Sequence, residues 1–214
     1  MAGFNQFFDL PDGTEDSRYG VALDQRVLRN VHVGFDVSRS KMTVPVLSTD
    51  SVTEFDWHDR TAKAYVYWAL PRGRERTGIS GCSAAIAVQY EFDKMTRPEE
   101  LPGDEGIVSL DTRLLPIRFT FFPAEQLALQ VTSTYVRQTG RLQVGVGFDS
   151  FDVNQRFWVT DFSVNYRILA PRGILALGVS NLFDRKVDGF QELDKSNPRF
   201  ALGRLAFVRV TLQF

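Results

Sequence analysis

The 214 residues are enough for one domain with a substantial core, and their formal net charge of -1 leaves no basic excess to neutralise the phosphates of a nucleic acid. No stretch approaches the ~18 consecutive apolar residues of a membrane helix, so a helical membrane protein is also excluded. A membrane β-barrel is not excluded, because only every second residue of a barrel strand faces lipid and the mean hydropathy then stays near zero.

Apolar and polar residues alternate in nine segments of the chain, and this period of two predicts a β-strand in each. In the first segment, for example, Tyr19, Val21 and Leu23 share one face of the strand. Residues 1–17 are expected to be poorly structured or to supply part of a tenth strand, and residues 18–214 to form the sheet. The strands are expected at about residues 19–24, 30–38, 61–70, 84–93, 113–121, 127–135, 158–168, 174–183 and 206–214.

Shorter and longer connections alternate between these segments. The shorter ones are expected near residues 26–28, 71–81, 123–126 and 170–173. The longer ones are expected at residues 42–55, 97–107, 140–154 and 184–199. Outer-membrane barrels have short periplasmic turns and longer extracellular loops. Tracing the alternation back from the last strand places the C-terminus on the periplasmic side.

The pattern favours an all-β fold, an antiparallel up-and-down transmembrane β-barrel of about nine or ten strands. An odd strand count in a bacterial chain favours an incomplete part of a larger barrel. A soluble β-sandwich is the alternative fold, and it predicts that the aliphatic faces pack against a second sheet. Sandwich strands average ~5–6 residues, whereas several segments here approach the ~9–11 residues that a tilted membrane strand needs.

Charged residues of both signs fall on the polar faces and are candidates to line a lumen. In a wide barrel they would set ion or solute preference, and in a small closed barrel they would pair to fill the interior. The lumen-facing candidates are Glu91, Asp93, Arg113, Arg118, Asp161, Arg167 and Arg209. No metal or other cofactor is expected, because the lone Cys82 offers no ligand cluster and no phosphate-binding loop occurs.

His58 lies between Asp56 and Asp59 at the junction of a predicted loop and strand. A histidine paired with a carboxylate at the extracellular rim suggests the alternative function of a barrel hydrolase. That alternative predicts His58 within hydrogen-bond reach of Asp56 or Asp59. It lacks a recognisable nucleophile, because no Gly-x-Ser-x-Gly elbow occurs. We therefore expect no catalytic residues and a protein that is not an enzyme.

The end of the chain carries a motif. Asn181, Leu182, Phe183 and Asp184 are followed by two basic residues and, about twenty residues later, by Gly203 and Arg204 before the last strand. This arrangement resembles the C-terminal signature of TonB-dependent outer-membrane receptors, with Val187 in place of the family's aromatic residue and Leu202 in place of its proline. The likeness covers roughly the last sixty residues.

Two further resemblances concern the assembly and the wider architecture of such barrels. The last strand, with apolar residues at alternate positions and a terminal phenylalanine, resembles the signal that the barrel-assembly machinery recognises; its residues are Val208, Val210, Leu212 and Phe214. The stretches 114–122 and 134–138 are similar to barrels fused behind periplasmic tetratricopeptide repeats, which also carry the Asn-Leu-Phe-Asp motif.

The resemblance implies a place in the outer membrane of a Gram-negative cell and a part in solute transport, as a receptor or a porin-like channel. The implied partners are outer-membrane lipid, the barrel-assembly machinery and TonB, the last through an N-terminal region that is missing here. The first ten residues have no cationic stretch followed by an apolar one, so we expect either a removed leader or a piece of a longer chain.

Overall fold

The computed structural model describes residues 13–47, 52–70, 83–98, 106–144, 149–168, 173–187 and 203–212. Their regular structure is nine strands: β1 Glu15–Leu28, β2 Val31–Leu47, β3 Val52–Leu70, β4 Ser83–Thr96, β5 Gly106–Ala124, β6 Leu127–Val144, β7 Asp149–Ile168, β8 Gly173–Ser180 and β9 Leu205–Leu212. The strands follow sequence order in one sheet, and all neighbours are antiparallel. The all-β antiparallel prediction is confirmed. Among the described residues no helix could cross a membrane.

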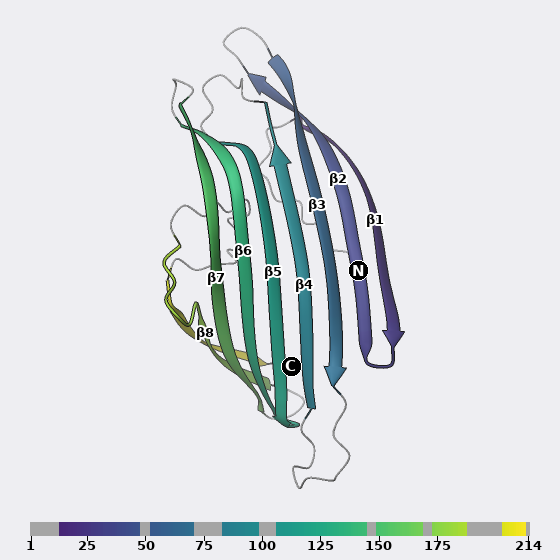
Figure 1. The fold of residues 1–214 in the computed structure, drawn as a ribbon, viewed down its shortest axis with the longest axis vertical. Coiled ribbons are helices and arrows are strands. Elements are labelled where there is room, and N and C mark those ends of the chain that lie inside the picture. The colour runs from purple at the N-terminus through teal and green to yellow at the C-terminus, as the bar shows by residue number, and fades with distance from the viewer. Residues whose placement is uncertain are drawn as a thin grey trace.

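The sheet is curved and has two edges. Figure 1 shows the long strands β1 to β7 side by side, with the shorter β8 lying obliquely near the lower end of the sheet. Within the described residues no pairing joins the edge strands β1 and β9. Because direction alternates along a nine-stranded antiparallel meander, both edges run the same way. Antiparallel closure of this sheet therefore needs an odd number of additional strands.

Two of the predicted long loops are mostly strand. β2 continues to Leu47 and β3 begins at Val52, so the loop predicted at 42–55 is wrong. β6 likewise continues to Val144 and β7 begins at Asp149, so the loop predicted at 140–154 is wrong as well. The stretches predicted at 97–107 and 184–199 lie almost entirely between strands.

Two strand ends also differ from the prediction. The first turn consists of residues 29–30 rather than 26–28, because β1 passes through a bulge between Arg26 and Leu28 without ending. The eighth strand ends at Ser180 rather than Phe183. Asn181 takes a left-handed backbone conformation, with φ 49°, which a strand does not allow.

Pro45 of β2 and Pro116 of β5 lie where the sheet does not need their missing N–H. β1 pairs with β2 only as far as Thr43, so Pro45 lies on a strand that has become an edge. The ladder between β4 and β5 has a gap at Pro116, between the paired positions of Ile117 and Leu114. The strand nevertheless continues through Pro116 without a change of register.

Side-chain alternation and register define two faces of the sheet, face A with Val66 and face B with Lys63. We call the half that contains the turns 29–30 and 125–126 the proximal half, and the other the distal half. The buried apolar side chains of the strands lie on face B, from the middle of the sheet to its distal end: Met42, Val44, Met95, Val108, Leu110, Leu114, Val136, Leu142, Val153, Phe157 and Val159. The core therefore occupies one face of one half.

Candidate functional site

An apolar belt covers face A of the proximal half across all nine strands. Cross-strand register places its members side by side, and none of them is charged. Many are exposed, including Val66, Trp68 and Val208. The belt consists of Tyr19, Val21, Leu23, Val31, Val33, Phe35, Val37, Ala62, Ala64, Val66, Trp68, Leu70, Ala84, Ile86, Val88, Tyr90, Phe92, Leu115, Ile117, Phe119, Phe121, Leu127, Leu129, Val131, Ser133, Tyr135, Trp158, Thr160, Phe162, Val164, Tyr166, Ile168, Leu175, Leu177, Val179, Ala206, Val208, Val210 and Leu212.

The belt is long enough for its strands to cross a membrane. On β3 it extends from Ala62 to Leu70, which at ~3.3 Å per residue is roughly 26 Å along the strand. A membrane strand tilted by about 45° needs ~9–11 residues to cross the bilayer, and this stretch is within that range. Directly distal to the belt, face A of the same strand carries Arg60, His58 and Asp56. The boundary between apolar and charged residues is therefore sharp.

Several polar side chains at the level of the belt pair with one another or lie at its borders, whereas Gln25 on the edge strand β1 is exposed opposite Val33. Ser133 and Thr160 are opposite each other on β6 and β7, and their hydroxyl oxygens are 3.1 Å apart in a hydrogen bond. At the distal border the rings of Tyr135 and Trp158 are 5.3 Å apart. At the proximal border the Tyr166 hydroxyl donates to the side chain of Gln126, in the turn between β5 and β6. Such aromatic borders are typical of membrane barrels.

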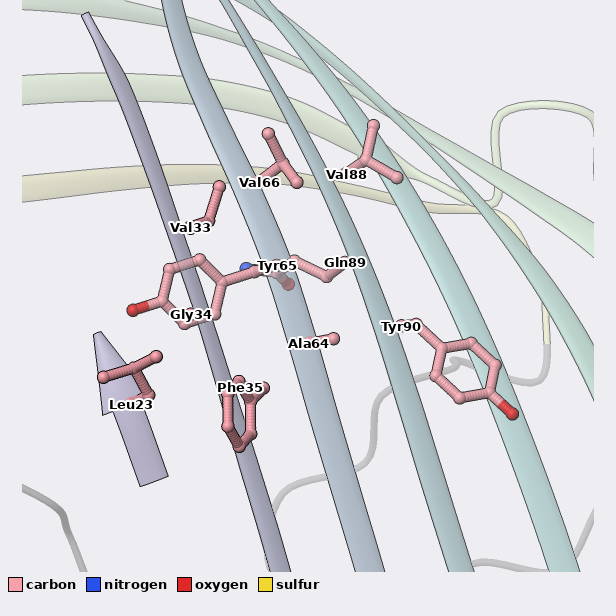
Figure 2. A pocket seen from close by; sticks show the side chains of 10 residues that line it. All are labelled: Leu23, Val33, Gly34, Phe35, Ala64, Tyr65, Val66, Val88, Gln89 and Tyr90. Carbon is pink, nitrogen blue, oxygen red and sulfur yellow. The ribbon is translucent and has the colours of Figure 1, made fainter. Parts of the chain in front are cut away.

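A shallow depression of about 400 Å³ lies on the belt over β1 to β4. Figure 2 shows that Ala64, which carries only a methyl group, lies between the larger side chains of Phe35 and Tyr90. Leu23 and Val66 line the same depression. The depression is a low part of a mainly apolar surface, and Tyr65, Gln89 and Tyr90 also line it.

Face B of the proximal half is polar, as the predicted lumen-facing residues require. Six of the seven candidates are on face B of β4, β5, β7 and β9: Glu91, Asp93, Arg118, Asp161, Arg167 and Arg209. The register places Glu91 opposite the oppositely charged Lys63 on β3, whereas Arg118 is opposite the neutral Thr132 on β6. A further polar contact on face B joins β3 to β1, since the Tyr65 hydroxyl donates to Asp24 at 2.5 Å.

Arg113 is the exception among the predicted lumen-facing residues. It lies on face A, because β5 keeps its alternation through Pro116 and Arg113 therefore shares the face of Leu115. Its guanidinium carbon is 5.6 Å from the centre of the Phe92 ring, and its Nε donates to Asp111 Oδ1 at 2.9 Å. Its position is at the distal border of the belt.

The motif residues that follow β8 form one compact turn. The Asn181 side chain is buried; its Nδ2 donates to the Arg185 carbonyl and its Oδ1 accepts from the Arg185 N–H, both at 2.8 Å. Its own N–H donates to Asp161 Oδ1 at 2.8 Å. The carboxylate of Asp184 accepts from the N–H of Arg204 at 3.0 Å, so the two parts of the motif are in direct contact.

The other motif residues anchor or flank this turn. The Leu182 N–H donates to the Thr160 carbonyl at 2.7 Å, which ties the turn to β7. Phe183 is 74% exposed and is not part of the core. Gly203 lies next to the Asp184 carboxylate, with which a side-chain carbon added at Gly203 would make an ordinary contact at 3.9 Å.

Sequence analysis did not identify the structural role of Val187. This side chain is buried in a cluster with Leu114, Val136, Phe157 and Val159 on face B. The chain after the motif therefore passes over face B and packs on β5, β6 and β7. The spacing of Val187 from the Asn-Leu-Phe-Asp motif was the available signal, but only the fold shows which side chains it meets.

The histidine predicted for a rim hydrolase does not form the required pair. His58 lies on face A and Asp59 on face B. Asp56 shares the face of His58, but its carboxylate binds Lys41 at 2.7 Å and Thr43 at 3.1 Å. The bond from Lys41 lowers the pKa of Asp56, whereas burial raises the pKa of Asp59. Within the described ranges no hydrogen bond joins His58 to either carboxylate, and no cluster of metal ligands occurs.

Three of the four residues predicted to form an assembly signal lie on one face of the last strand. Val208, Val210 and Leu212 are exposed members of the belt on β9. Phe214 lies outside the described residues, as do Cys82 and Leu202. Comparison with models of protein families, with curated proteins and with solved structures finds no match for this chain.

Proposed function

We propose that this chain is the outer-membrane β-barrel segment of a receptor or channel that takes part in moving a solute across the outer membrane. The observation that carries the proposal is the uncharged belt of roughly 26 Å on face A. A continuous exposed apolar surface of this extent is unfavourable in water, and soluble monomers rarely have one. Lipid tails would cover it.

The other face supports a transport role rather than a purely structural one. Opposite the belt, face B carries charges of both signs, among them Glu91, Arg118 and Arg167. Ionisable groups at membrane depth are costly unless they face water or each other. In the proposed barrel they line the path of the solute and set its charge preference.

The two ends of the sheet differ, and this difference suggests how the proposed barrel is oriented in the membrane. At the proximal end the belt reaches the turns 29–30 and 125–126 almost directly, because Val31 and Leu127 belong to it. At the distal end the strands continue beyond the belt; on β3 this extension runs from Val52 to Thr61. Short periplasmic turns and long extracellular projections are typical of outer-membrane barrels. We therefore assign the proximal end to the periplasm, where the barrel-assembly machinery would meet β9.

The motif after β8 supports the likeness to TonB-dependent receptors. Asn181 and Asp184 belong to one hydrogen-bonded turn, and the N–H of Arg204, 20 residues after Asp184, is bonded to it. A segment preceding the barrel would provide the contact with TonB. Because the two edge strands run the same way, such a barrel would also contain an odd number of further strands.

Reconstitution tests the proposal. The chain is refolded from urea in the presence of phosphatidylcholine vesicles, floated in a density gradient and examined by circular dichroism. We expect β-structure that floats with the vesicles and resists alkaline extraction, and solute efflux from the vesicles if the barrel closes. A soluble, β-rich monomer that forms without lipid and does not float would contradict the proposal and favour a sandwich.

A further inference from the structure

A group of cations borders the distal edge of the belt on face A. In the row next to the belt, Arg113, Arg137 and Arg156 are direct cross-strand neighbours on β5, β6 and β7. In the next row, Arg39, Arg60 and Lys94 are direct neighbours on β2, β3 and β4. We call these six residues the cationic collar.

Few acidic residues neutralise the positive charge of the collar. Asp111 is the only acidic residue in these two rows, and its carboxylate binds Arg113 Nε at 2.9 Å and Nη2 at 3.2 Å. The other five collar side chains form no ion pair or hydrogen bond within the part of the chain that the structure describes. Like charges directly opposite each other destabilise a sheet, so an uncompensated collar is unfavourable.

Farther from the belt, the same face behaves differently. There Lys41 is paired with Asp56 at 2.7 Å, and Arg141 with Asp152 at 3.6 Å. Both basic residues that the structure describes on the distal part of face A are thus paired, and acidic residues, including Glu15 and Glu54, outnumber them there. The excess of positive charge is confined to the two rows that touch the belt.

We propose that the cationic collar binds the phosphate-bearing headgroups of anionic lipids in the membrane leaflet at the distal end of the belt. This inference rests on the proposed function, because the belt must lie in a bilayer to bring headgroups to this height. The two rows are two residues apart and span roughly 7 Å, which matches the headgroup layer on one side of a bilayer, about 5–8 Å deep.

The chemistry of the collar suits such a ligand. Five of its residues are arginines, whose planar guanidinium groups bind phosphate oxygens in pairs. Neighbouring arginines such as Arg137 and Arg156 can contact two phosphates of one headgroup or two adjacent lipids. Phosphates would neutralise the repulsion between the rows, while the acyl chains of the same lipids would cover the belt.

Tryptophan quenching by brominated lipids tests the proposal in reconstituted vesicles. Trp158 is 50% exposed on face A and lies two residues from Arg156. A Trp68→Phe background removes the other tryptophan of the belt. Quenching by brominated phosphatidylglycerol is compared with quenching by brominated phosphatidylcholine, which gives the relative association constant of the two lipids.

We expect the anionic lipid to associate at least about fivefold more strongly than the neutral one, and less so at high salt. Combining Arg137→Gln with Arg156→Gln should reduce the ratio to near one. The matched control combines Lys41→Gln with Arg141→Gln, which removes the same charge from the same face but at ion-paired positions, and it should keep the preference.

The outcomes separate the two proposals. Equal quenching by both lipids in vesicles that contain the inserted wild-type chain would overturn the collar inference and leave the proposed function intact. Failure to insert into phosphatidylcholine vesicles would overturn both. Loss of the preference on addition of millimolar inorganic phosphate at constant ionic strength would overturn the lipid assignment in favour of a free anion. The wild-type comparison decides even where a variant does not fold.

Discussion

Asn181 combines a buried side chain, two hydrogen bonds to the backbone of Arg185 and a left-handed backbone conformation. Asparagine tolerates this conformation better than other residues with a side chain, except aspartate, which occupies the second such position at Asp184. The motif could be identified from sequence. Its contacts with Asp161 could not, because they depend on how β8 pairs with β7.

Replacing Asn181 with alanine should destabilise the folded chain by about 2–4 kcal/mol, since both hydrogen bonds are lost and alanine is strained at positive φ. Asn181→Gly is the matched control; it loses the hydrogen bonds without the strain and should have an intermediate effect. Urea unfolding in detergent micelles, followed by tryptophan fluorescence, measures the difference. Wild-type stability in both variants would contradict this role.

Asp59 should make stability depend on pH. Burial raises the pKa of this carboxyl above its ordinary value of 3.8, while a hydrogen bond with Asp93 and the charge of Arg18 oppose the shift. Between 3.8 and the raised pKa the folded state holds more protons than the unfolded state, so the free energy of unfolding falls as pH rises through this window.

The Asp59→Asn variant should be more stable than wild type above that window and lose this slope. Asp56 provides the control, because its pKa is lowered by the Lys41 hydrogen bond and its contribution is lost only as pH falls below 3.8. Asp56→Asn should therefore leave the slope above 3.8 unchanged. The measurement is urea unfolding at a series of pH values, and a slope that persists in Asp59→Asn would contradict the assignment.

At the scale of elements, the nine strands were predictable and their lengths were not. In the proximal half the apolar residues point to face A, so the alternation of apolar and polar residues is clear in the sequence. In the distal half the phase inverts: Met42 and Val44 are buried on face B, while Lys41 and Thr43 occupy face A. A stretch with this inverted phase and a proline resembles a polar loop in sequence, which is why β2 and β3 were predicted too short.

The error at Arg113 has a related cause. Arg113 would lie on the polar face only if the strand were kinked at Pro116, because strict alternation from Ile117 puts Arg113 on face A. The unchanged register between β4 and β5 shows that the strand continues without a bulge there. The other six candidates share the polar face B, because no such interruption affects their strands; that this face lines a lumen stays a prediction.

Two glycines pair with aromatic rings on neighbouring strands of face B. Gly34 is opposite Tyr65, and Gly178 is opposite Phe207. A side-chain carbon at Gly34 would collide with the Tyr65 ring, whose hydroxyl is held by Asp24. An aromatic ring that covers a strand glycine is a known device for fixing register. Neither pair was apparent before the register was known.

Gly34→Ala and Gly178→Ala should each cost about 1–3 kcal/mol, because the ring must leave its place. The control is Gly203→Ala, where the added carbon meets nothing closer than 3.9 Å and stability should change little. Thermal unfolding in detergent gives the comparison. If Gly34→Ala were equally harmful in a Tyr65→Ala background, the collision would not be its cause.

In the whole molecule, the apolar surface changes from one face of the sheet to the other. Face A is apolar in the proximal half and charged in the distal half, whereas face B is polar in the proximal half and apolar in the distal half. The belt and the cationic collar meet along a line that crosses β2 to β7, and this line could not be predicted from one strand alone. It appears only when the register aligns residues such as Arg60, Lys94 and Arg137 at similar heights. The arrangement matches the environment of a bilayer and its surface.

Val66 lies near the centre of the belt and provides a test of depth. Val66→Arg should reduce the free energy of unfolding from a bilayer by about 2–4 kcal/mol, the cost of arginine at the midplane on the lipid face. Gln130→Arg places the same charge on face B, where the effect should be small. Urea unfolding from vesicles provides both values, and equal losses would indicate that face A is not in lipid.

The central claim is that face A of the proximal half contacts lipid, and spin labelling along β3 tests it most directly. Single cysteines from His58 to Trp68, introduced in a Cys82→Ser background, carry nitroxide labels whose collisions with oxygen and with a water-soluble nickel chelate are measured in vesicles. The account predicts preferential oxygen access at Ala62, Ala64, Val66 and Trp68, chelate access at the residues between them, and chelate access at His58 and Arg60. Chelate access at Ala62, Ala64, Val66 and Trp68, or exclusion of both reagents from these four positions, would contradict it.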